Sequence, residues 1–200
     1  MPRRFLFVII TGFLIGALAG AAALVLNTMP QGQGVATTGK ALVGGPFTLV
    51  DTSGKTVTDK DFRGRYMLIF FGFTHCPDIC PTELQVMDAT MEALGTDAKK
   101  VAPIFISVDP ERDTPEVVGD YVKNFGDRII GLTGSPEQVA AAAKAYRASY
   151  SKFKDKESAT DYSIDHSTLV YFMGPDGEYI AHFPFGTSAD KMSEGIRRYL

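Results

Sequence analysis

The 200-residue sequence predicts an α/β sandwich in which helices flank a mixed central β-sheet. Two nearly unbroken apolar runs, residues 67–73 and 101–108, are typical of central strands that are buried on both faces. Between and after these runs, apolar residues recur at the three- and four-residue spacings of amphipathic helices. A tight-turn sequence at residues 174–177 separates two further apolar segments that we expect to pair as an antiparallel hairpin.

The predicted elements follow one another as a small hairpin, a strand-helix-strand unit, a further helix, strand and helix, and an antiparallel hairpin with a terminal helix. Pro81 suits the first turn of the first helix because that position needs no backbone N–H. Thr114 and Pro115 start the second helix in the same way, and residues 135–138 have the form of a capping box for the third. We expect strands at residues 47–50, 55–58, 67–71, 101–108, 129–132, 167–173 and 178–183, and helices at residues 81–94, 114–125, 135–146 and 188–199.

One long stretch, residues 149–165, is polar and highly charged and shows no apolar period. We therefore predict an exposed loop, whose end delivers His166 to the start of the next strand.

The N-terminal segment, residues 1–26, is predicted to be a membrane anchor. Its uncharged part, residues 5–26, is long enough to cross a bilayer as a helix. A cleaved signal peptide is the alternative, because small residues at positions 19–23 resemble a cleavage site. The arginines at positions 3 and 4 precede the span, so the positive-inside rule places the rest of the chain outside the cytoplasm.

This orientation predicts a single-pass protein of the cytoplasmic (inner) membrane with its C-terminal domain in the periplasm, or on the intermembrane-space side of the inner mitochondrial membrane if the chain is eukaryotic. Residues 27–45 are polar and rich in glycine, which is typical of a flexible tether. Residues 46–200 then form the folded domain.

Composition excludes several classes of function. The formal net charge of −3 argues against a nucleic-acid partner. Two cysteines are too few for a small fold held together by disulfides, and their spacing is not that of a four-ligand zinc site. A special use of the cysteine pair is therefore expected.

Cys76 and Cys80 lie where the first apolar strand gives way to a helix, and a proline follows each of them. On one helical turn their Cα atoms would be about 6 Å apart, close enough to form a disulfide or to share one ion. The positive end of the helix favours thiolates there. Two thiolates select copper(I), zinc or an iron–sulfur cluster, and they leave room for a third ligand.

Among the three histidines, His166 is the best candidate for that ligand, although a lone histidine at a strand start is more often an ordinary surface residue. His75 adjoins Cys76, but in an extended segment the two side chains point apart, so we expect a structural or supporting role. His182 has no partner in the sequence and is expected to have no role.

A thiol pair at the first strand-to-helix junction makes the predicted fold resemble the thioredoxin fold. Three ordered motifs extend the resemblance: residues 74–81 (THCPDICP), residues 106–115 (ISVDPERDTP), and residues 165–168 (DHST), the last followed by GPDG. Together they resemble the Sco/SenC family of copper-binding proteins, over nearly all of the chain from Pro46 onward.

The resemblance implies a thioredoxin-like metallochaperone, not an enzyme, that loads copper into the CuA centre of cytochrome c oxidase subunit II. It implies copper ligation by Cys76, Cys80 and His166, with the ion carried as Cu(I) and the use of Cu(II) left open. The expected partners are subunit II or its assembly factors, the membrane through the N-terminal helix, and a separate thiol reductant, because only reduced thiols bind copper.

Five further residues of these motifs are expected to have supporting roles. Asp78 and Asp165 are expected to orient or tune the site. We expect Asp109, Arg112 and Asp113 to form a loop that caps the following helix, in slight preference to a docking role.

A thiol-disulfide oxidoreductase is the main alternative, with Cys76 as nucleophile and Cys80 as resolving thiol. The four-residue spacing and the absence of a proline from residues 164–167 argue against it. A structural zinc site is less favoured, because three ligands near an exposed loop make a poor closed site.

Overall fold

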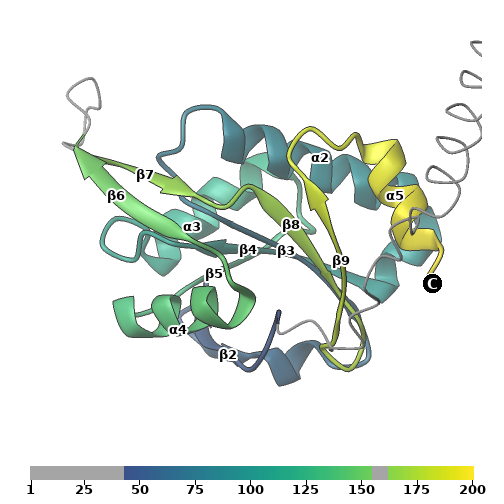
Figure 1. Cartoon of the computed structure of the whole chain (residues 1–200), viewed down its shortest axis with the longest axis horizontal. Coiled ribbons are helices and arrows are strands. Elements are labelled where there is room, and N and C mark those ends of the chain that lie inside the picture. The colour runs from purple at the N-terminus through teal and green to yellow at the C-terminus, as the bar shows by residue number, and fades with distance from the viewer. Residues whose placement is uncertain (1–42, 155–161) are drawn as a thin grey trace, which may run out of the picture. The chain divides into compact units, whose positions relative to one another are not determined.

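The computed structural model describes residues 43–154 and 162–200 (Figure 1). Within these residues a seven-stranded sheet has the strand order β2-β1-β5-β4-β3-β8-β9, and β6 and β7 form a separate two-stranded sheet. The strands of the larger sheet are β1 (Thr48–Asp51), β2 (Thr56–Thr58), β3 (Tyr66–Gly72), β4 (Val101–Ser107), β5 (Ile130–Thr133), β8 (Leu169–Met173) and β9 (Tyr179–Pro184). The helices are α2 (Ile79–Leu94), α3 (Pro115–Val122), α4 (Pro136–Tyr146) and α5 (Ala189–Arg197), with short 3₁₀ turns η1 (Asp59–Phe62), η2 (Gly95–Lys100) and η3 (Lys123–Phe125).

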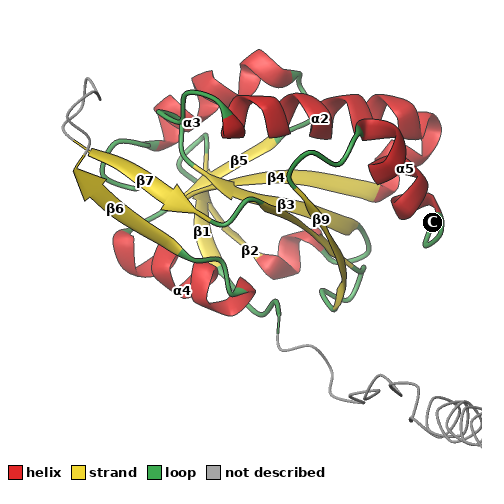
Figure 2. Cartoon of the chain, turned by 45° about the horizontal axis from the view of Figure 1, so that its top comes forward, coloured by secondary structure: helices red, strands yellow, loops and turns green. Residues whose placement is uncertain are grey.

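The central sheet is mixed. Strands β3, β4 and β5 run parallel, whereas β8 pairs antiparallel with β3, and β1 pairs antiparallel with β5. The crossovers through α2 and α3 step in the same direction across the sheet, so right-handed connections place both helices on one face. Figure 2 shows α2, α3 and α5 on one side of the sheet and α4 on the other. The predicted α/β sandwich with a mixed, thioredoxin-like sheet is therefore confirmed.

Burial explains why the two apolar runs became the centre of this sheet. Every residue of β4 is buried, as are residues 67–72 of β3, because helices cover both faces of these strands. Gly72 at the end of β3 pairs with Ser107 at the end of β4. The two loops that follow these strands therefore begin side by side at one edge of the sheet, where parallel α/β folds commonly build their sites.

The prediction of an exposed loop at residues 149–165 was wrong. Strand β6 (Tyr150–Lys154) pairs antiparallel with β7 (Tyr162–His166), and Figure 1 shows this hairpin extending from the body of the domain. Among residues 150–154 and 162–166 only Ile164 is buried, because residues 151–154 of β6 are exposed on both faces of the strand. An alternating pattern with a single buried residue looks like a charged loop in the sequence.

The predicted membrane span, residues 1–26, lies outside the described residues. No helix within residues 43–154 and 162–200 is long and apolar enough to cross a membrane. The division into anchor, tether and domain stays a prediction.

Candidate metal centre

The cysteine pair lies at the mouth of α2. Cys76 is in the loop between β3 and α2, and Cys80 is the second residue of the helix. Cys80 is fully buried, while Cys76 is partly exposed. Gly72 makes this packing possible, since a Cβ at that position would lie 2.7 Å from Cys80 Sγ.

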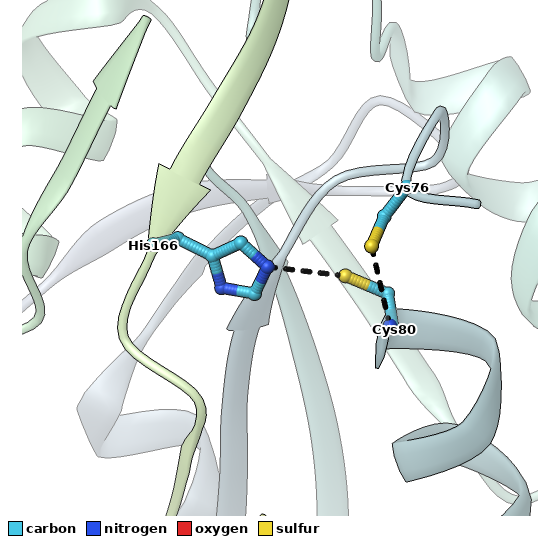
Figure 3. Close-up of side chains that lie close together, drawn as sticks. All are labelled: Cys76, Cys80 and His166. Carbon is cyan, nitrogen blue, oxygen red and sulfur yellow. Dashed lines mark hydrogen bonds between the residues drawn. The ribbon is translucent and has the colours of Figure 1, made fainter. Parts of the chain in front are cut away.

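His166 reaches this pair from the last position of β7 (Figure 3). Its Nε2 lies 3.4 Å from Cys80 Sγ, and the ligand atoms of Cys76, Cys80 and His166 all lie within 4.8 Å of one another. The sequence predicted a loop as the carrier of His166, but a β-strand holds it instead. Two cysteines four positions apart and a histidine 86 positions further along the chain thus converge on one point.

A single hydrogen bond sets the orientation and tautomer of His166. Its Nδ1 lies 3.0 Å from the carbonyl oxygen of Ser167, which can only accept, so Nδ1 carries the proton. The unprotonated Nε2 then faces the sulfur atoms, as metal ligation requires. The rings of Phe70 and Phe73 contact the imidazole edge-on, with centroid distances of 5.9 and 5.7 Å, and limit its rotation.

The two sulfur atoms share one proton unequally. The Cys80 thiol donates a hydrogen bond to Cys76, and this bond, helped by the backbone N–H groups of Cys80, at 3.4 Å, and of Asp78, lowers the pKa of Cys76 to about 4. The same bond, together with burial, raises the pKa of Cys80. Near neutral pH the metal-free pair therefore holds one thiolate, at Cys76, and one thiol, at Cys80.

An open cleft of about 260 Å³ lies over the site. Cys76 and His166 line it, and Phe73 and Ile164 supply apolar walls. Cys80 lies beneath it and is inaccessible to solvent. Two sulfur ligands and one imidazole nitrogen suit a soft, low-coordinate cation, and the cleft would let such an ion be captured and passed on.

Asp78 and Asp165, which were predicted to tune the site, are exposed residues that line this cleft. Within the described part of the chain, neither carboxylate forms a hydrogen bond with Cys76, Cys80 or His166. The backbone N–H of Asp78 does bond to Cys76 and helps to lower its pKa. Their predicted tuning role stays a prediction.

The other two histidines lie away from the three ligand atoms. His75 Nδ1 contacts Thr74 Oγ1 at 3.0 Å and lies 3.8 Å from an Asp113 oxygen, so its side chain faces the loop and not the sulfur pair. His182 contacts the Tyr179 hydroxyl on β9. The structure assigns neither of them to the centre.

The prediction that Asp109, Arg112 and Asp113 cap the following helix was wrong. Thr114 alone caps α3, because its hydroxyl accepts from the backbone N–H of Val117 at 3.3 Å. Asp109 and Asp113 are instead fully buried. Asp113 binds the loop that leads to Cys76, and Asp109 and Arg112 bind the hairpin that carries His166.

A signal for these buried residues was present in the sequence. The motif that contains them follows a strand predicted to lie beside the strand before Cys76, and parallel strands end at the same edge of a sheet. Their buried carboxylates could not be distinguished from capping ones, because a helix start signal follows directly at Thr114.

Comparison with known proteins gives matches to one family. The SCO1/SenC family model matches residues 35–200 of the chain. The protein named "Protein SCO1 homolog, mitochondrial" of Homo sapiens is 47% identical over 147 residues, which make up 72% of this chain and 48% of that protein. The chain thus spans about half the length of this relative.

Two solved structures with bound copper are similar in fold and sequence. The copper-bound ScoI of Bradyrhizobium japonicum has a TM-score of 0.73 and 44% identity, and the match covers 79% of this chain and 99% of that one. The copper-bound ScoI of Arabidopsis thaliana has a TM-score of 0.73 and 42% identity, and the match covers 78% of this chain and 99% of that one.

Proposed function

The chain belongs to the SCO1/SenC family, and from this premise we propose that it is a membrane-anchored metallochaperone that delivers copper to the CuA centre of cytochrome c oxidase subunit II. The observation that carries the proposal is the convergence of Cys76 Sγ, Cys80 Sγ and His166 Nε2 within 4.8 Å of one another. The copper-bound relatives support copper as the cargo.

The donor set suits Cu(I) well. Thiolates are soft ligands that favour Cu(I), and a neutral imidazole completes a low-coordinate site. Binding needs both sulfur atoms as thiolates, so the ion must displace the proton that Cys80 holds in the metal-free protein. The same three ligands also suit Cu(II), and we propose Cu(I) as the form transferred.

Transfer to a partner requires that the ion be reachable. Cys76 and His166 line the open cleft, whereas Cys80 is buried beneath it. We propose that ligands of subunit II, or of one of its assembly factors, enter through the cleft. They would replace Cys76 and His166, which line the cleft, before they replace Cys80. The membrane anchor at residues 1–26 would keep the domain on the periplasmic side, or on the intermembrane-space side in a eukaryote, where a separate reductant keeps the thiols reduced.

Copper titration of the reduced full-length protein in detergent tests the ligand set. We expect one copper ion per chain, with X-ray absorption showing two sulfur ligands and one nitrogen ligand. Cys76→Ser or Cys80→Ser should abolish binding, and His166→Ala should weaken it by at least about tenfold. His182→Ala is the matched control and should bind as the wild type does. An unchanged affinity in His166→Ala would overturn the ligand set.

Delivery is tested separately, by mixing the copper-loaded protein with the metal-free soluble domain of subunit II. After transfer of two Cu(I) ions and one-electron oxidation with added ferricyanide, the visible absorption of a formed CuA centre should appear with the loaded wild type and not with the metal-free protein. Copper that stays on the chain while free copper ions still load subunit II would contradict a delivery role and leave the copper site standing.

Thiol-disulfide exchange is a second candidate, because Cys76 is a partly exposed thiolate beside a second thiol. In that reaction Cys76 would attack a partner's disulfide, and Cys80 would then displace the partner's second thiolate, leaving a Cys76–Cys80 disulfide and a reduced partner. A disulfide-reduction assay run beside the copper titration discriminates between the two functions. Turnover lost in Cys80→Ser and kept in His166→Ala would favour the oxidoreductase.

A further inference from the structure

The hairpin that carries His166 is not hydrogen-bonded into the central sheet. Strands β6 and β7 pair only with each other, and His166 is the last residue of β7. Strand β8 of the central sheet begins at Leu169 and holds the end of the hairpin next to His166, so the position of the imidazole over Cys80 depends on β8 and on what fastens the rest of the hairpin to the body of the domain. Ile164, which is 4% exposed, makes an apolar contact there, but one buried side chain does not fix an orientation.

Arg112, in the loop after β4, makes the most extensive polar contact with the hairpin. Its guanidinium lies 3.8 Å from the centroid of the Tyr162 ring, and its Nη1 donates to the Tyr162 carbonyl oxygen at 3.2 Å. One side chain thus binds both the ring and the backbone of the first described residue of β7.

Asp109 joins the two residues of this attachment, Arg112 and Tyr162, through its carboxylate. Its carboxylate is fully buried and accepts a hydrogen bond from Arg112 Nε on one oxygen and from the Tyr162 hydroxyl, at 2.8 Å, on the other. Lys152 of β6 lies 3.9 Å from the same carboxylate and 2.6 Å from Glu111. The two acidic groups of the loop, Asp109 and Glu111, are thus paired with Arg112 of the loop itself and with Lys152 of the hairpin.

Two routes connect this attachment to the metal centre. Tyr162, Ile164 and His166 occupy alternate positions of β7 and so lie on one face of the strand. The Phe73 ring lies between the two sites, 5.8 Å from the Arg112 guanidinium and 5.7 Å from the His166 ring. A displacement of Tyr162 would therefore move His166.

We propose that Asp109, Arg112 and Tyr162 form a positioning clamp that holds the β6–β7 hairpin against the domain and thereby sets His166 over the cysteine pair. The inference rests on the proposed copper site. The clamp residues do not touch the ion. They set how long His166 stays bound to it, because an imidazole on a loosened hairpin leaves the copper more often.

The clamp is tested with Tyr162→Phe, which removes only the hydroxyl bonded to Asp109 and keeps the ring beneath Arg112. Copper loss from the loaded full-length protein to a Cu(I) chelator should become about three- to tenfold faster, the range typical of coupled neighbours. Tyr179→Phe removes the same atom from β9 and should leave the rate unchanged. Arg112→Lys is a second variant, which keeps the charge and loses the flat stacking surface. It should also make copper loss faster.

A double-mutant cycle separates positioning from a general loss of stability. In a His166→Ala background, Tyr162→Phe should have no further effect on the rate of copper loss, because no imidazole remains to be positioned. An equal acceleration in both backgrounds, or none in either, would overturn the clamp.

A metal-free measurement keeps the inference separate from the copper proposal. In the reduced wild type, the ¹⁵N chemical shifts of the His166 ring should report one tautomer, protonated on Nδ1. Tyr162→Phe should move both shifts toward averaged values, and Tyr179→Phe should not. If the wild type binds no copper, the proposed function fails, and the ¹⁵N shifts alone test the clamp. Shifts that are the same in Tyr162→Phe as in the wild type would then overturn the clamp.

Discussion

The carboxylate of Asp113 accepts hydrogen bonds from both the backbone N–H and the hydroxyl of Thr74, at 3.0 and 2.6 Å, although the two residues are 39 positions apart. It also accepts from Ser107 Oγ at 2.6 Å. Asp113 therefore ties the loop that leads to Cys76 to the end of β4. The position of the first sulfur ligand depends on this buried carboxylate, as that of the imidazole depends on the hairpin.

Removal of the Asp113 carboxylate should destabilise the fold. In Asp113→Ala the buried hydroxyl of Ser107 and two part-buried donors of Thr74 lose their acceptor, so we expect a loss of about 3 kcal/mol in the free energy of unfolding. Urea unfolding of the reduced, metal-free protein measures it. Asp120→Ala, at an exposed aspartate paired with Lys123, is the matched control and should cost less than about 1 kcal/mol. Similar losses in the two variants would contradict the structural role of Asp113.

The two cysteines should differ sharply in reactivity. The pKa of Cys76 is lowered to about 4 by its hydrogen bond from Cys80, so Cys76 is a thiolate throughout the neutral range. At pH 6, iodoacetamide should modify Cys76 alone, at a rate that stays flat up to pH 8. Cys80 is fully buried, and its pKa is raised, so it should react only in urea. Peptide mass spectrometry locates the adduct.

An ordinary thiol at Cys76 would give the opposite profile, with a rate that rises about tenfold for each pH unit below its pKa. Bound copper should protect Cys76 from the reagent, and protein unfolded in urea, in which both thiols are exposed, provides the reference rate.

Glu83 should make stability depend on pH. This carboxyl lies on the inward side of α2, is 1% exposed, and its Oε1 has no hydrogen-bond partner within the described residues. Burial raises its pKa from 4.5 to about 7. Below pH 4.5 the group is neutral in both states, and as the pH rises to 7 the unfolded chain loses its proton first, so folding becomes less favourable.

Glu83→Gln should therefore remove this pH dependence. Between pH 5 and pH 8 the wild type should lose about 2 to 3 kcal/mol of unfolding free energy relative to the variant. Urea titrations of the reduced, metal-free proteins at the two pH values measure the difference. Parallel pH curves for the two proteins would show that Glu83 is ionised in the folded state.

The sequence predicted those parts of the fold that are held in place by apolar burial. Strands β3 and β4 are covered on both faces, so their apolar runs are unbroken, and α2 shows its inward face at Leu84, Met87 and Met91. The β6–β7 hairpin could not be predicted in this way, because it rests on polar contacts of Tyr162 with Arg112 and Asp109 instead of apolar burial.

The cysteine pair of the metal centre was easier to predict from the sequence than the other residues of the centre, for a similar reason. The spacing of Cys76 and Cys80 within one helical turn is local, so the sequence shows that they meet. His166 lies 86 positions beyond Cys80 and depends on the hairpin, so the residues alone made it only the best candidate, and its expected role as a ligand needed the family resemblance. Asp109 and Asp113 were assigned to the wrong partner, because a buried carboxylate and a helix cap have the same residue type and the same loop context.

Gly72, the last residue of β3, lies against the metal centre. A Cβ at this position would lie 2.7 Å from Cys80 Sγ and 2.9 Å from Phe105 Cε2, both closer than real Cβ contacts. Both neighbours are fully buried and have no free space into which to move. The requirement for glycine here is therefore steric, set by the approach of the sulfur atom to the strand.

Gly72→Ala should displace Cys80 Sγ and weaken both the fold and the site. We expect a loss of about 1 to 3 kcal/mol in unfolding free energy, as for other overpacked cores, and a lower copper affinity. Gly119→Ala is the control away from the site, because the atom nearest to its Cβ would be Thr52 Cβ at 3.2 Å, a milder contact, and alanine favours a helix. Urea unfolding and copper titration measure both effects. Copper affinity equal to that of the wild type, with stability reduced, would show that the sulfur atom keeps its place and that Phe105 alone absorbs the added methyl group.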